Sequence, residues 1–510
     1  MATSLSSTPA PGKSRKVGAT EDLQAALDSA HCGDTIELEA GGSFNTTYKL
    51  PAKPCDDAHW IVIRTSAPDS ILPPEGGRIN PCYAGINTLH GMSLSCTSTK
   101  NVMAKIVGQP PVLVADGANH YRLIGLELTQ IPGKLAYSIL NISDAADHVI
   151  VDRCWIHGTA TDDSQQGVRF NSRYLAVVDS FISDIHFNGA DTQAIGGPGG
   201  SGPYAIINNY LEAAGENMMF GGGAAATTPS DIEIRHNHLY KPLVWRPTDP
   251  GFVGIKFTVK DLFEVKNAQR MLVEGNIFEN MWGTAIVITP KNQNGRCPVC
   301  LAADITWRYN IIRHAGAAFT IFNAPTDQGA ISQGSQRISV HDNLFDDIDA
   351  AKWGGDSRLF VIGTCPQCPV VQDVSIRHNT ATDGPKSFLF VHDPAAHKIP
   401  RFVFSDNIVP HGKYGVLGCG ATVPEVLDSC FDTPVFQKNL VIGDIGRKIY
   451  PSGQLFSADW RGARLETEGA SALRYGLAPE SKYKKAASDG KDVGADMEAI
   501  RQATSGVSQW

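Results

Sequence analysis

A short motif that recurs along the chain most constrains what this sequence can fold into. Alternating apolar residues lead to one asparagine, and in most copies two further apolar residues follow. The spacing between successive asparagines runs from 28 to 39 residues and averages about 33. The eight copies are centred on Asn209, Asn237, Asn276, Asn310, Asn343, Asn379, Asn407 and Asn439. Segments around Leu126, Cys154 and Ser180 continue the pattern upstream without asparagine.

A period of 20 to 50 residues is typical of a repeat architecture. Each unit here alternates with period two, is rich in Val, Ile and Phe, and ends in turn residues, which indicates β-strands. A second short strand follows most of the asparagines. Two or three short strands in each unit of about 30 residues predict an all-β fold, a parallel β-helix of about ten or eleven turns. We expect the asparagines to face inward and form a scaffold ladder along the stack.

The repeat divides the chain into four expected parts. Residues 1–17 are polar and are expected to be a disordered tail, and residues 18–118 to form an N-terminal cap and the first irregular turns. Within that cap, the apolar spacing of Leu23, Ala26, Leu27 and Ala30 predicts a helix that closes the open end of the stack. Residues 119–445 are expected to be the regular β-helix. Residues 446–510 lose the period and are predicted to pack along its outside.

Charge and hydropathy exclude several kinds of partner. The 510 residues carry a formal net charge of −8, which argues against nucleic acid because phosphate contacts need a basic surface. No stretch approaches 18 consecutive apolar residues, so no membrane-spanning helix is expected. The first residues lack an apolar leader segment. We expect that a leader has been removed and that the protein is secreted or periplasmic and a monomer.

Eleven cysteines are many for a cytosolic enzyme, and the odd number leaves at least one outside any pairing within the chain. Two pairs stand out, Cys297 with Cys300 and Cys365 with Cys368, each with two residues between the cysteines. They are compatible with local disulfides, with a zinc site of four thiolates, or with free thiols. We favour disulfides, which agree with export.

Three parts of the sequence resemble a known group of proteins. The opening LQAALDSAHCGDTIEL, the asparagine-marked turns and the ending DGKDVGADMEAI resemble right-handed parallel β-helix proteins of the pectin-lyase-like superfamily, over about residues 20–445. The segments DTQAIGGPGG, GENMMFGG and VKDLFEVKNAQRMLVEGNIFEN resemble a bacterial branch of right-handed β-helix proteins. The resemblance implies chemistry on polysaccharides by lyases, glycoside hydrolases, esterases or epimerases. The stretch Glu264-Val265-Lys266-Asn267 is similar to the lysine-bearing acidic segment of alginate and chondroitin lyases.

Charged residues gather in four consecutive turns, between about residues 157 and 270. If Val168 and Phe170 point inward, Arg169 points outward, and the same alternation turns Glu264 and Lys266 outward. The longest insertion lies between Asn237 and Asn276 and is expected to overhang this face. The residues expected to bind substrate are Asn171, Gln193, Asn217, Trp245, Lys256 and Lys260.

Three functions fit such a groove. A lyase that cleaves a uronic-acid-containing glycan by β-elimination is favoured, with Lys266 as base or neutralising group and Arg169 and Arg270 near the carboxylate. No cofactor is certain, but Glu216 and Glu264 are candidate calcium ligands. The alternative is a glycoside hydrolase with paired carboxylates, drawn from Asp191, Glu216 and Glu264. The third is a non-catalytic glycan-binding or surface protein.

Each of these residues also has a structural interpretation. Trp245 would pack against the wall of the β-helix, and Glu264 and Lys266 would form a solvated ion pair. Asp191 and Glu216 would belong to turns. His157 and His186, near predicted strand ends, are expected to be structural.

Overall fold

The computed structural model describes residues 1–510 except 91, 327, 383, 393–396, 444–448, 464, 466–474 and 509–510. The described chain forms two compact units, and each is presented by itself. The first comprises residues 1–219 and 229–260, and the second comprises residues 220–228 and 261–508.

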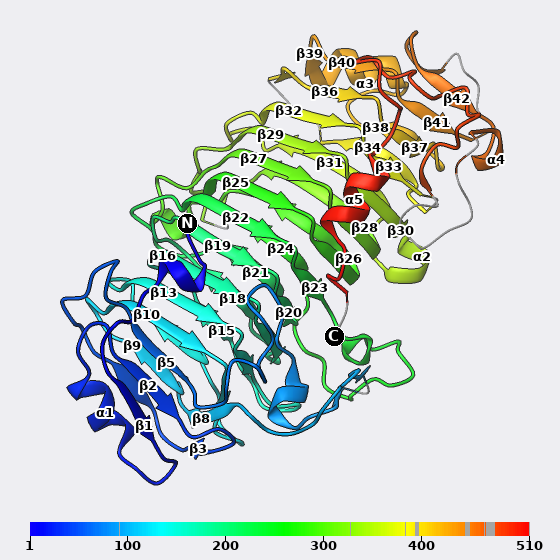
Figure 1. Ribbon diagram of the computed structural model, residues 1–510. Helices are drawn as coiled ribbons and strands as arrows, with labels where there is room; N and C mark the ends of the chain where they lie inside the picture. Colours follow the sequence, from blue (N-terminus) through cyan, green and yellow to red (C-terminus); the bar gives the residue numbers. More distant parts are fainter. Residues whose placement is uncertain are drawn as a thin grey trace. The chain divides into compact units, whose positions relative to one another are not determined.

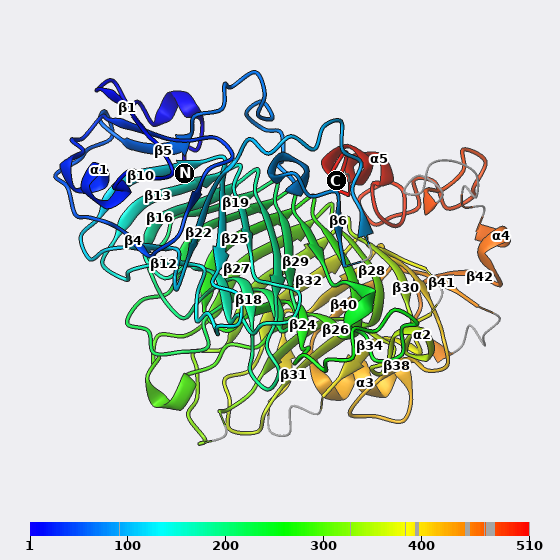
Figure 2. The same ribbon diagram turned by 90° about the horizontal axis from the view of Figure 1, so that it is seen from below.

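The chain of the first unit alternates between two parallel sheets. In one of them β10, β13, β16 and β19 lie side by side in chain order (Figures 1 and 2). Its first sheet consists of β1 (Ser14–Val17), β2 (Thr35–Leu38), β5 (Ile61–Thr65), β10 (Asn119–Ile124), β13 (Asp147–Asp152), β16 (Arg173–Val178), β19 (Tyr204–Ile207) and β22 (Ser230–Arg235). Its second sheet has two rows of strands. One row is β3 (Ser43–Phe44), β8 (Ala104–Gly108), β11 (Leu126–Gln130), β14 (Trp155–His157), β17 (Phe181–Ile185), β20 (Tyr210–Ala213) and β23 (His238–Tyr240). The other is β4 (Tyr48–Leu50), β9 (Val112–Val114), β12 (Leu140–Ile142), β15 (Gln166–Arg169), β18 (Gln193–Gly197) and β21 (Glu216–Phe220).

The second unit repeats this arrangement. Its first sheet consists of β25 (Ala268–Glu274), β27 (Ala302–Arg308), β29 (Ser335–His341), β32 (Gln372–Arg377), β36 (Val403–Ser405) and β40 (Val435–Gln437). Its second sheet consists of β24 (Asp261–Val265), β26 (Ile277–Ile288), β28 (Ile311–Asn323), β30 (Leu344–Ile348), β31 (Arg358–Thr364), β33 (Thr380–Ala381), β34 (Ser387–Val391), β37 (Ile408–Pro410), β38 (Gly415–Leu417), β41 (Leu440–Ile442) and β42 (Leu455–Ser457). Successive turns pair in parallel, which is the architecture of a parallel β-helix.

Helices and small strand pairs lie outside these sheets. In the first unit they are η1 (Leu5–Ser7), α1 (Leu23–Ser29), η2 (Pro81–Ala84), the hairpin β6 (Thr88–Leu89) with β7 (Met92–Ser93), and η3 (Leu243–Trp245). In the second unit they are η4 (Gln293–Gly295), α2 (Ala350–Trp353), α3 (Val423–Cys430), α4 (Trp460–Ala463), α5 (Met497–Ala503), and the pair β35 (Ile399–Pro400) with β39 (Phe431–Asp432).

The asparagine ladder predicted from the repeat is confirmed. In the second unit the backbone N–H of Asn310 donates to Oδ1 of Asn343 (3.1 Å), and the N–H of Asn343 donates to Oδ1 of Asn379 (3.1 Å). The same bond recurs through Asn407 and Asn439. In the first unit Ser180 takes this place between Cys154 and Asn209, as the motif without asparagine indicated. The side chains therefore satisfy backbone groups at the buried corner of each turn.

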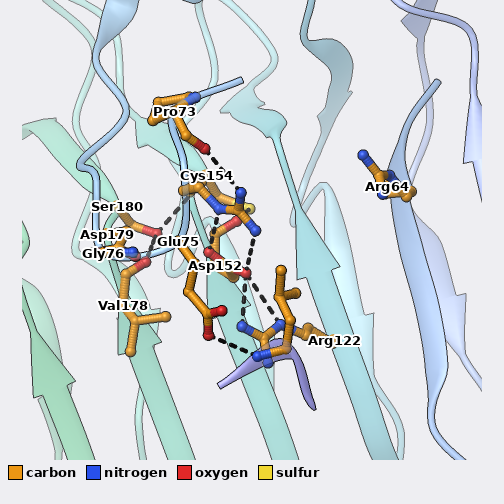
Figure 3. A network of polar contacts seen from close by, with 12 residues as sticks. Arg64, Pro73, Glu75, Gly76, Arg122, Asp152, Cys154, Val178, Asp179 and Ser180 are labelled. Carbon is orange, nitrogen blue, oxygen red and sulfur yellow. Dashed lines mark hydrogen bonds and ion pairs between the residues drawn. The ribbon is translucent and has the colours of Figure 1, made fainter. Parts of the chain in front are cut away.

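The N-terminal residues differ from the prediction. Residues 1–17 were expected to be disordered, yet β1 pairs in parallel with β2 and Thr8 is buried. Arg122, fully buried, donates to the Ser4 carbonyl and to Thr8 Oγ1 on one side and to Asp152 on the other. Figure 3 shows Arg122 and Asp152 pointing toward one another. A buried guanidinium needs such partners, and this network holds the N-terminal segment on the first sheet.

Regular turns also begin earlier than residue 119. Because β1, β2 and β5 belong to the first sheet, the described residues give eight strands of this sheet in the first unit and six in the second, more than the ten or eleven turns predicted. A helix forms near Leu23 as α1, with Asp22 accepting a hydrogen bond from the Ala25 N–H at its N-terminus, and its closing of the stack stays a prediction.

The C-terminal segment packs on the second unit. Met497 and Ile500 of α5, together with Val507, form a buried cluster with Ile277, Ile311 and Leu344. The N–H of Gly494 donates to the Asp406 carbonyl, and the N–H of Ala495 donates to Thr380 Oγ1. This segment therefore lies across strands from several successive turns.

Ten of the eleven cysteines form disulfides, and Cys154 is a buried free thiol. The pairs are Cys32–Cys55, Cys82–Cys96, Cys297–Cys300, Cys365–Cys368 and Cys419–Cys430. The two Cys-x-x-Cys motifs are thus local disulfides, and no thiolates remain in them for a zinc site. Within the described ranges, no helix is long and apolar enough to cross a membrane.

Candidate functional site

The alternation predicted around β15 is confirmed. Val168 and Phe170 are buried in the interior, and the side chain of Arg169 is 38% exposed on the outside. Arg169 Nη2 and Asn171 Nδ2 both donate to Asp144 Oδ1, each at 2.8 Å. The structure therefore brings two of the predicted site residues together on one exposed carboxylate.

Four more of the predicted residues meet in the first unit. Gln193 Nε2 donates to Glu216 Oε2 at 2.8 Å, and Lys260 Nζ contacts Glu216 Oε1 at 2.5 Å and Asp191 Oδ2 at 3.0 Å. Glu216 and Gln193 are buried, whereas Lys260 is one-third exposed and Asp191 about half exposed. Both oxygens of Glu216 are engaged, so this carboxylate holds Lys260 at the surface.

Asn217 and Trp245 were predicted to bind substrate, and the structure places both in the interior. Asn217 donates to the carbonyls of Leu211 and Tyr240 and accepts from Lys241 Nζ (2.9 Å). Trp245 is 1% exposed, and its ring packs against His90, His186 and Phe257. Asn217 points into the interior from β21, and Trp245 is covered because the insertion folds back against the wall, so in this structure neither side chain is open to a sugar.

Lys241 was missed by the sequence analysis. It is fully buried, and its ammonium donates to the carbonyls of Ala213, Ala214 and Gly215 at 2.7 to 2.9 Å. An ammonium needs this many acceptors to remain charged in the interior. Lys256, by contrast, is exposed, as predicted for the insertion.

Three of the residues predicted for catalysis, Glu264, Lys266 and Arg270, lie in the second unit. Glu264 lies on β24 and Lys266 directly after it, and Lys266 Nζ contacts Glu264 Oε2 at 2.8 Å. Both side chains are less than 10% exposed. Arg270 lies on β25 of the other sheet, where Arg337 and, less strongly, Arg270 lower the pKa of Asp304. Glu216 belongs to the first unit and Glu264 to the second, so their pairing around calcium stays a prediction.

A cavity that the sequence did not indicate opens on the first unit, over the outer face of β8, β11 and β14. Its volume is about 390 Å³. Lys105, Glu127 and Trp155 occupy one outward register position in these strands, and Thr129 and His157 occupy the next. The lining includes Leu89, His90, Lys105, Thr129, Gln130 and His157.

Glu127 is buried and contacts two of the residues that line the cavity. Its Oε1 contacts Lys105 Nζ at 2.8 Å and His157 Nε2 at 3.1 Å. Burial by itself raises the pKa of Glu127, but the hydrogen bond from His157 and the charges of His157 and Lys105 lower it below its ordinary value. The buried, ionised Glu127 thus holds at the cavity wall a lysine whose side chain is 36% exposed.

His157 has an oxygen acceptor at each ring nitrogen. Nε2 faces the Glu127 carboxylate, and Nδ1 lies 2.6 Å from the Gly158 carbonyl. These two acceptors orient the ring. The ring also stacks on Trp155, with centroids 3.9 Å apart. Together the contacts hold His157 in one orientation beside Lys105.

A second charged group borders the same cavity. His90 Nε2 forms a short ion pair with Asp184 Oδ1 and lies 3.5 Å from Glu212 Oε1. Burial lowers the pKa of His90, but the Asp184 hydrogen bond and the charges of Asp184 and Glu212 outweigh it and raise the pKa to about 9. Burial raises the pKa of Glu212 to about 7, and Tyr210 donates to its Oε2. Burial raises the pKa of Asp184 as well, but His90 brings it below its ordinary value.

His90 borders two cavities. It also lines a smaller one of about 260 Å³, together with Glu212, Tyr240 and the chain around η3. The donor atoms of His90, Asp184 and Glu212 lie within 4.8 Å of one another, as do those of Asp57, His120 and His148 elsewhere in the unit. In the first group the histidine is already paired with a carboxylate, and the charges are balanced without an ion.

No protein-family model matches the sequence, and no curated protein matches it. Among solved structures, the chain is similar to the PL6 family alginate lyase AlyGC (14% identity, 98% of this chain and 59% of that chain, TM-score 0.49). It is also similar to the PL6 family polysaccharide lyase Pedsa3628 from Pseudopedobacter saltans (12%, 91% and 98%, 0.46) and to the GH136 lacto-N-biosidase from Eubacterium ramulus (10%, 80% and 67%, 0.39). At identities this low, the likeness concerns the parallel β-helix fold alone.

Proposed function

We propose that this protein degrades a polysaccharide, as a lyase that cleaves a uronic-acid-containing glycan by β-elimination at the cavity of the first unit. One observation carries the proposal. The wall of this cavity presents two basic groups, Lys105 and His157, held side by side by the same oxygen of Glu127. A cavity with a few convergent polar groups and shifted pKa values is the expected form of a ligand site.

The chemistry of β-elimination needs positive charge at this place. A base removes the proton on C5 of the uronate, a double bond forms between C4 and C5, and the bond from C4 to the glycosidic oxygen breaks. The C5 proton is only weakly acidic until the neighbouring carboxylate is neutralised. In this proposal Lys105 pairs with that carboxylate, and a ring N–H of His157 protonates the glycosidic oxygen as the bond from C4 breaks.

A glycoside hydrolase is the second candidate, and one observation favours it. Glu212, with its pKa near 7, is protonated in part at neutral pH, while Asp184 beside it is ionised. Such a pair separates the roles of acid and base. However, Glu212 is fully buried and accepts hydrogen bonds at both oxygens, from Tyr210 and from the Asp184 N–H.

The disulfides support export, because such bonds persist in oxidising compartments. The proposed substrate is therefore a glycan outside the cytoplasm. The calcium expectation for Glu216 and Glu264 concerns residues outside this cavity and stays a prediction of the sequence.

The test is an assay of ultraviolet absorbance from unsaturated uronate ends, run in parallel with a reducing-end assay, on uronic and neutral glycans. We expect both signals to rise together on a uronic glycan. Reducing ends without absorbance would replace the lyase by the hydrolase. Activity on no glycan, with binding in a glycan array, would replace both by the non-catalytic alternative.

Variants locate the site. Lys105→Ala and His157→Gln should each lower kcat/KM by about a hundredfold or more, because each removes a group that acts in the transition state. Lys16→Ala, an exposed lysine on β1, is the matched control and should leave the rate unchanged. If Lys266→Ala abolishes activity while Lys105→Ala does not, the chemistry belongs to the pair on the second unit, and the cavity assignment is wrong.

A further inference from the structure

Two histidines stack on the outside of the first sheet in the first unit. His120 of β10 and His148 of β13 occupy neighbouring turns, and their rings are nearly parallel with centroids 4.3 Å apart. Tyr174 of β16 continues the stack at 4.2 Å. All three residues have positive φ values of 49° to 55°, a bend that turns their side chains away from the sheet.

The bend recurs at the equivalent position of other turns, but only some of these turns carry a histidine there. In the second unit the same bend carries Arg270, Asp304, Arg337, Asp373 and Arg401, all with positive φ. There the charges are matched along the stack, because Arg337 pairs with Asp304 and Arg401 with Asp373. In the first unit the position carries two adjacent imidazoles, and an Arg–Asp ion pair between neighbouring turns does not explain them.

Hydrogen bonds fix which ring nitrogens face outward to a ligand. His120 Nδ1 lies 2.7 Å from Asn119 Oδ1, and His148 Nδ1 lies 2.7 Å from Asp147 Oδ1. Asn119 uses its Nδ2 on the carbonyls of Lys53 and Gly117, so its Oδ1 is an acceptor. Each Nδ1 therefore carries the hydrogen, and in the neutral rings each Nε2 carries a lone pair.

Both lone pairs face one carboxylate. Asp57 Oδ1 lies 3.1 Å from His120 Nε2 and 3.9 Å from His148 Nε2. Three acceptor atoms that converge in this way require a cation or a proton between them. The donor atoms lie within 4.8 Å of one another, and an ion about 2.0–2.2 Å from each would bind all three once the stacked rings turn their Nε2 atoms toward it.

We propose that Asp57, His120 and His148 bind one divalent transition-metal ion of the zinc type. Imidazole nitrogen with one carboxylate suits zinc, copper or nickel, whereas calcium prefers oxygen alone. Asn119 and Asp147 hold the rings in the manner of outer partners at metal sites. The second oxygen of Asp147 accepts from Arg173, which fixes it in turn.

The surroundings define what the ion would do. Trp60 packs edge-on against both rings and forms the inner wall, with centroids 5.0 Å from His120 and 6.2 Å from His148. The side chain of Asp57 is 88% exposed, so the remaining coordination positions face water. The ion would fasten the loop that bears Asp57 to β10 and β13, next to the Cys32–Cys55 disulfide.

The experiment uses the untagged full chain, freed of metal by a chelator and dialysed, with zinc chloride as the probe. Calorimetric titration should give one zinc ion per chain, and zinc should raise Tm. His148→Ala and Asp57→Asn should each weaken zinc binding by about a hundredfold, and Asp147→Asn by about tenfold or more, with unchanged circular dichroism. His31→Ala, an exposed histidine next to Asp34, is the matched control and should bind zinc like the wild type.

Two results would overturn the proposal. One is a wild-type chain that takes up no zinc at micromolar concentration, which would mean that a proton bridges the three groups. The other is zinc affinity that is equal in the wild type, His148→Ala and Asp57→Asn, which would place the ion elsewhere. Substitution of cobalt for zinc gives an independent readout, because its visible spectrum should change in the wild type and not in His148→Ala.

Discussion

Replacing one asparagine in the middle of the ladder tests the physical basis of the fold. Asn343 is 1% exposed. Its Oδ1 accepts from the N–H and Nδ2 of Asn310, and its Nδ2 donates to the carbonyls of Trp307 and His341 and to Asn379 Oδ1. In Asn343→Ala the buried N–H of Asn310 loses this acceptor and the Trp307 carbonyl loses this donor. At about 1–3 kcal/mol for each buried group, the expected loss of stability is about 4 kcal/mol.

The assay is urea unfolding followed by circular dichroism, comparing midpoints and slopes. With a slope of about 3–4 kcal/mol per molar, the midpoint of Asn343→Ala should fall by roughly 1 M. Asn45→Ala is the control, because Asn45 is exposed and contacts Ser43 Oγ at its Oδ1. Its free energy of unfolding should change by less than about 0.5 kcal/mol. Equal midpoints for the two variants would refute the reasoning and show that stacked apolar side chains stabilise the turns without the ladder.

Two further predictions concern the ionisable and thiol groups. The pKa of His90 rises from 6.5 to about 9 on folding, so its contribution to the free energy of unfolding is complete below pH 6.5 and is lost as pH rises through 9. The free energy of unfolding in urea should therefore fall over this window by up to about 3 kcal/mol. The same pH dependence in a His90→Gln variant would contradict the assignment. Thiol titration of the unreduced, denatured chain should find one reactive thiol, Cys154. The native chain should show none, because burial raises the pKa of Cys154 to about 12. More than one thiol in the denatured chain would disprove the disulfide pairing.

The repeat could be predicted from sequence because its asparagines are chemically required. The backbone N–H and C=O groups at a buried corner must be hydrogen-bonded. An asparagine side chain, such as that of Asn209 or Asn310, makes these bonds at the turns that the motif marked. The N-terminal turns were missed because β1, β2 and β5 carry no such asparagine. Their place in the sheet depends instead on contacts with distant residues, such as that of Arg122 with Thr8.

The candidate site was only partly predictable. Alternation placed Arg169 outside and Val168 inside, because period two is a local property of a strand. The charged group at the cavity of the first unit, Lys105, Glu127 and His157, comes from three successive turns in the row β8, β11 and β14. The charge pattern that predicted a groove lies in the other row of strands, so it did not indicate this cavity. The residues directly after the upstream motifs, Glu127 and Trp155, were the available signal. Trp245 was open to either interpretation, since the path of an insertion depends on tertiary packing that no local pattern encodes.

The direction of the ladder bears on how this chain could have lengthened. In the second unit every backbone N–H at the corner donates to the side-chain oxygen of the following turn, from Asn310 through Asn407. Each turn therefore offers the same donor on one side and the same acceptor on the other. Duplicating or deleting a whole turn would rejoin matching surfaces, whereas inserting a single residue at the corner would not. The spacing between asparagines varies from 28 to 39 residues, so the corners tolerate loops of different length between them.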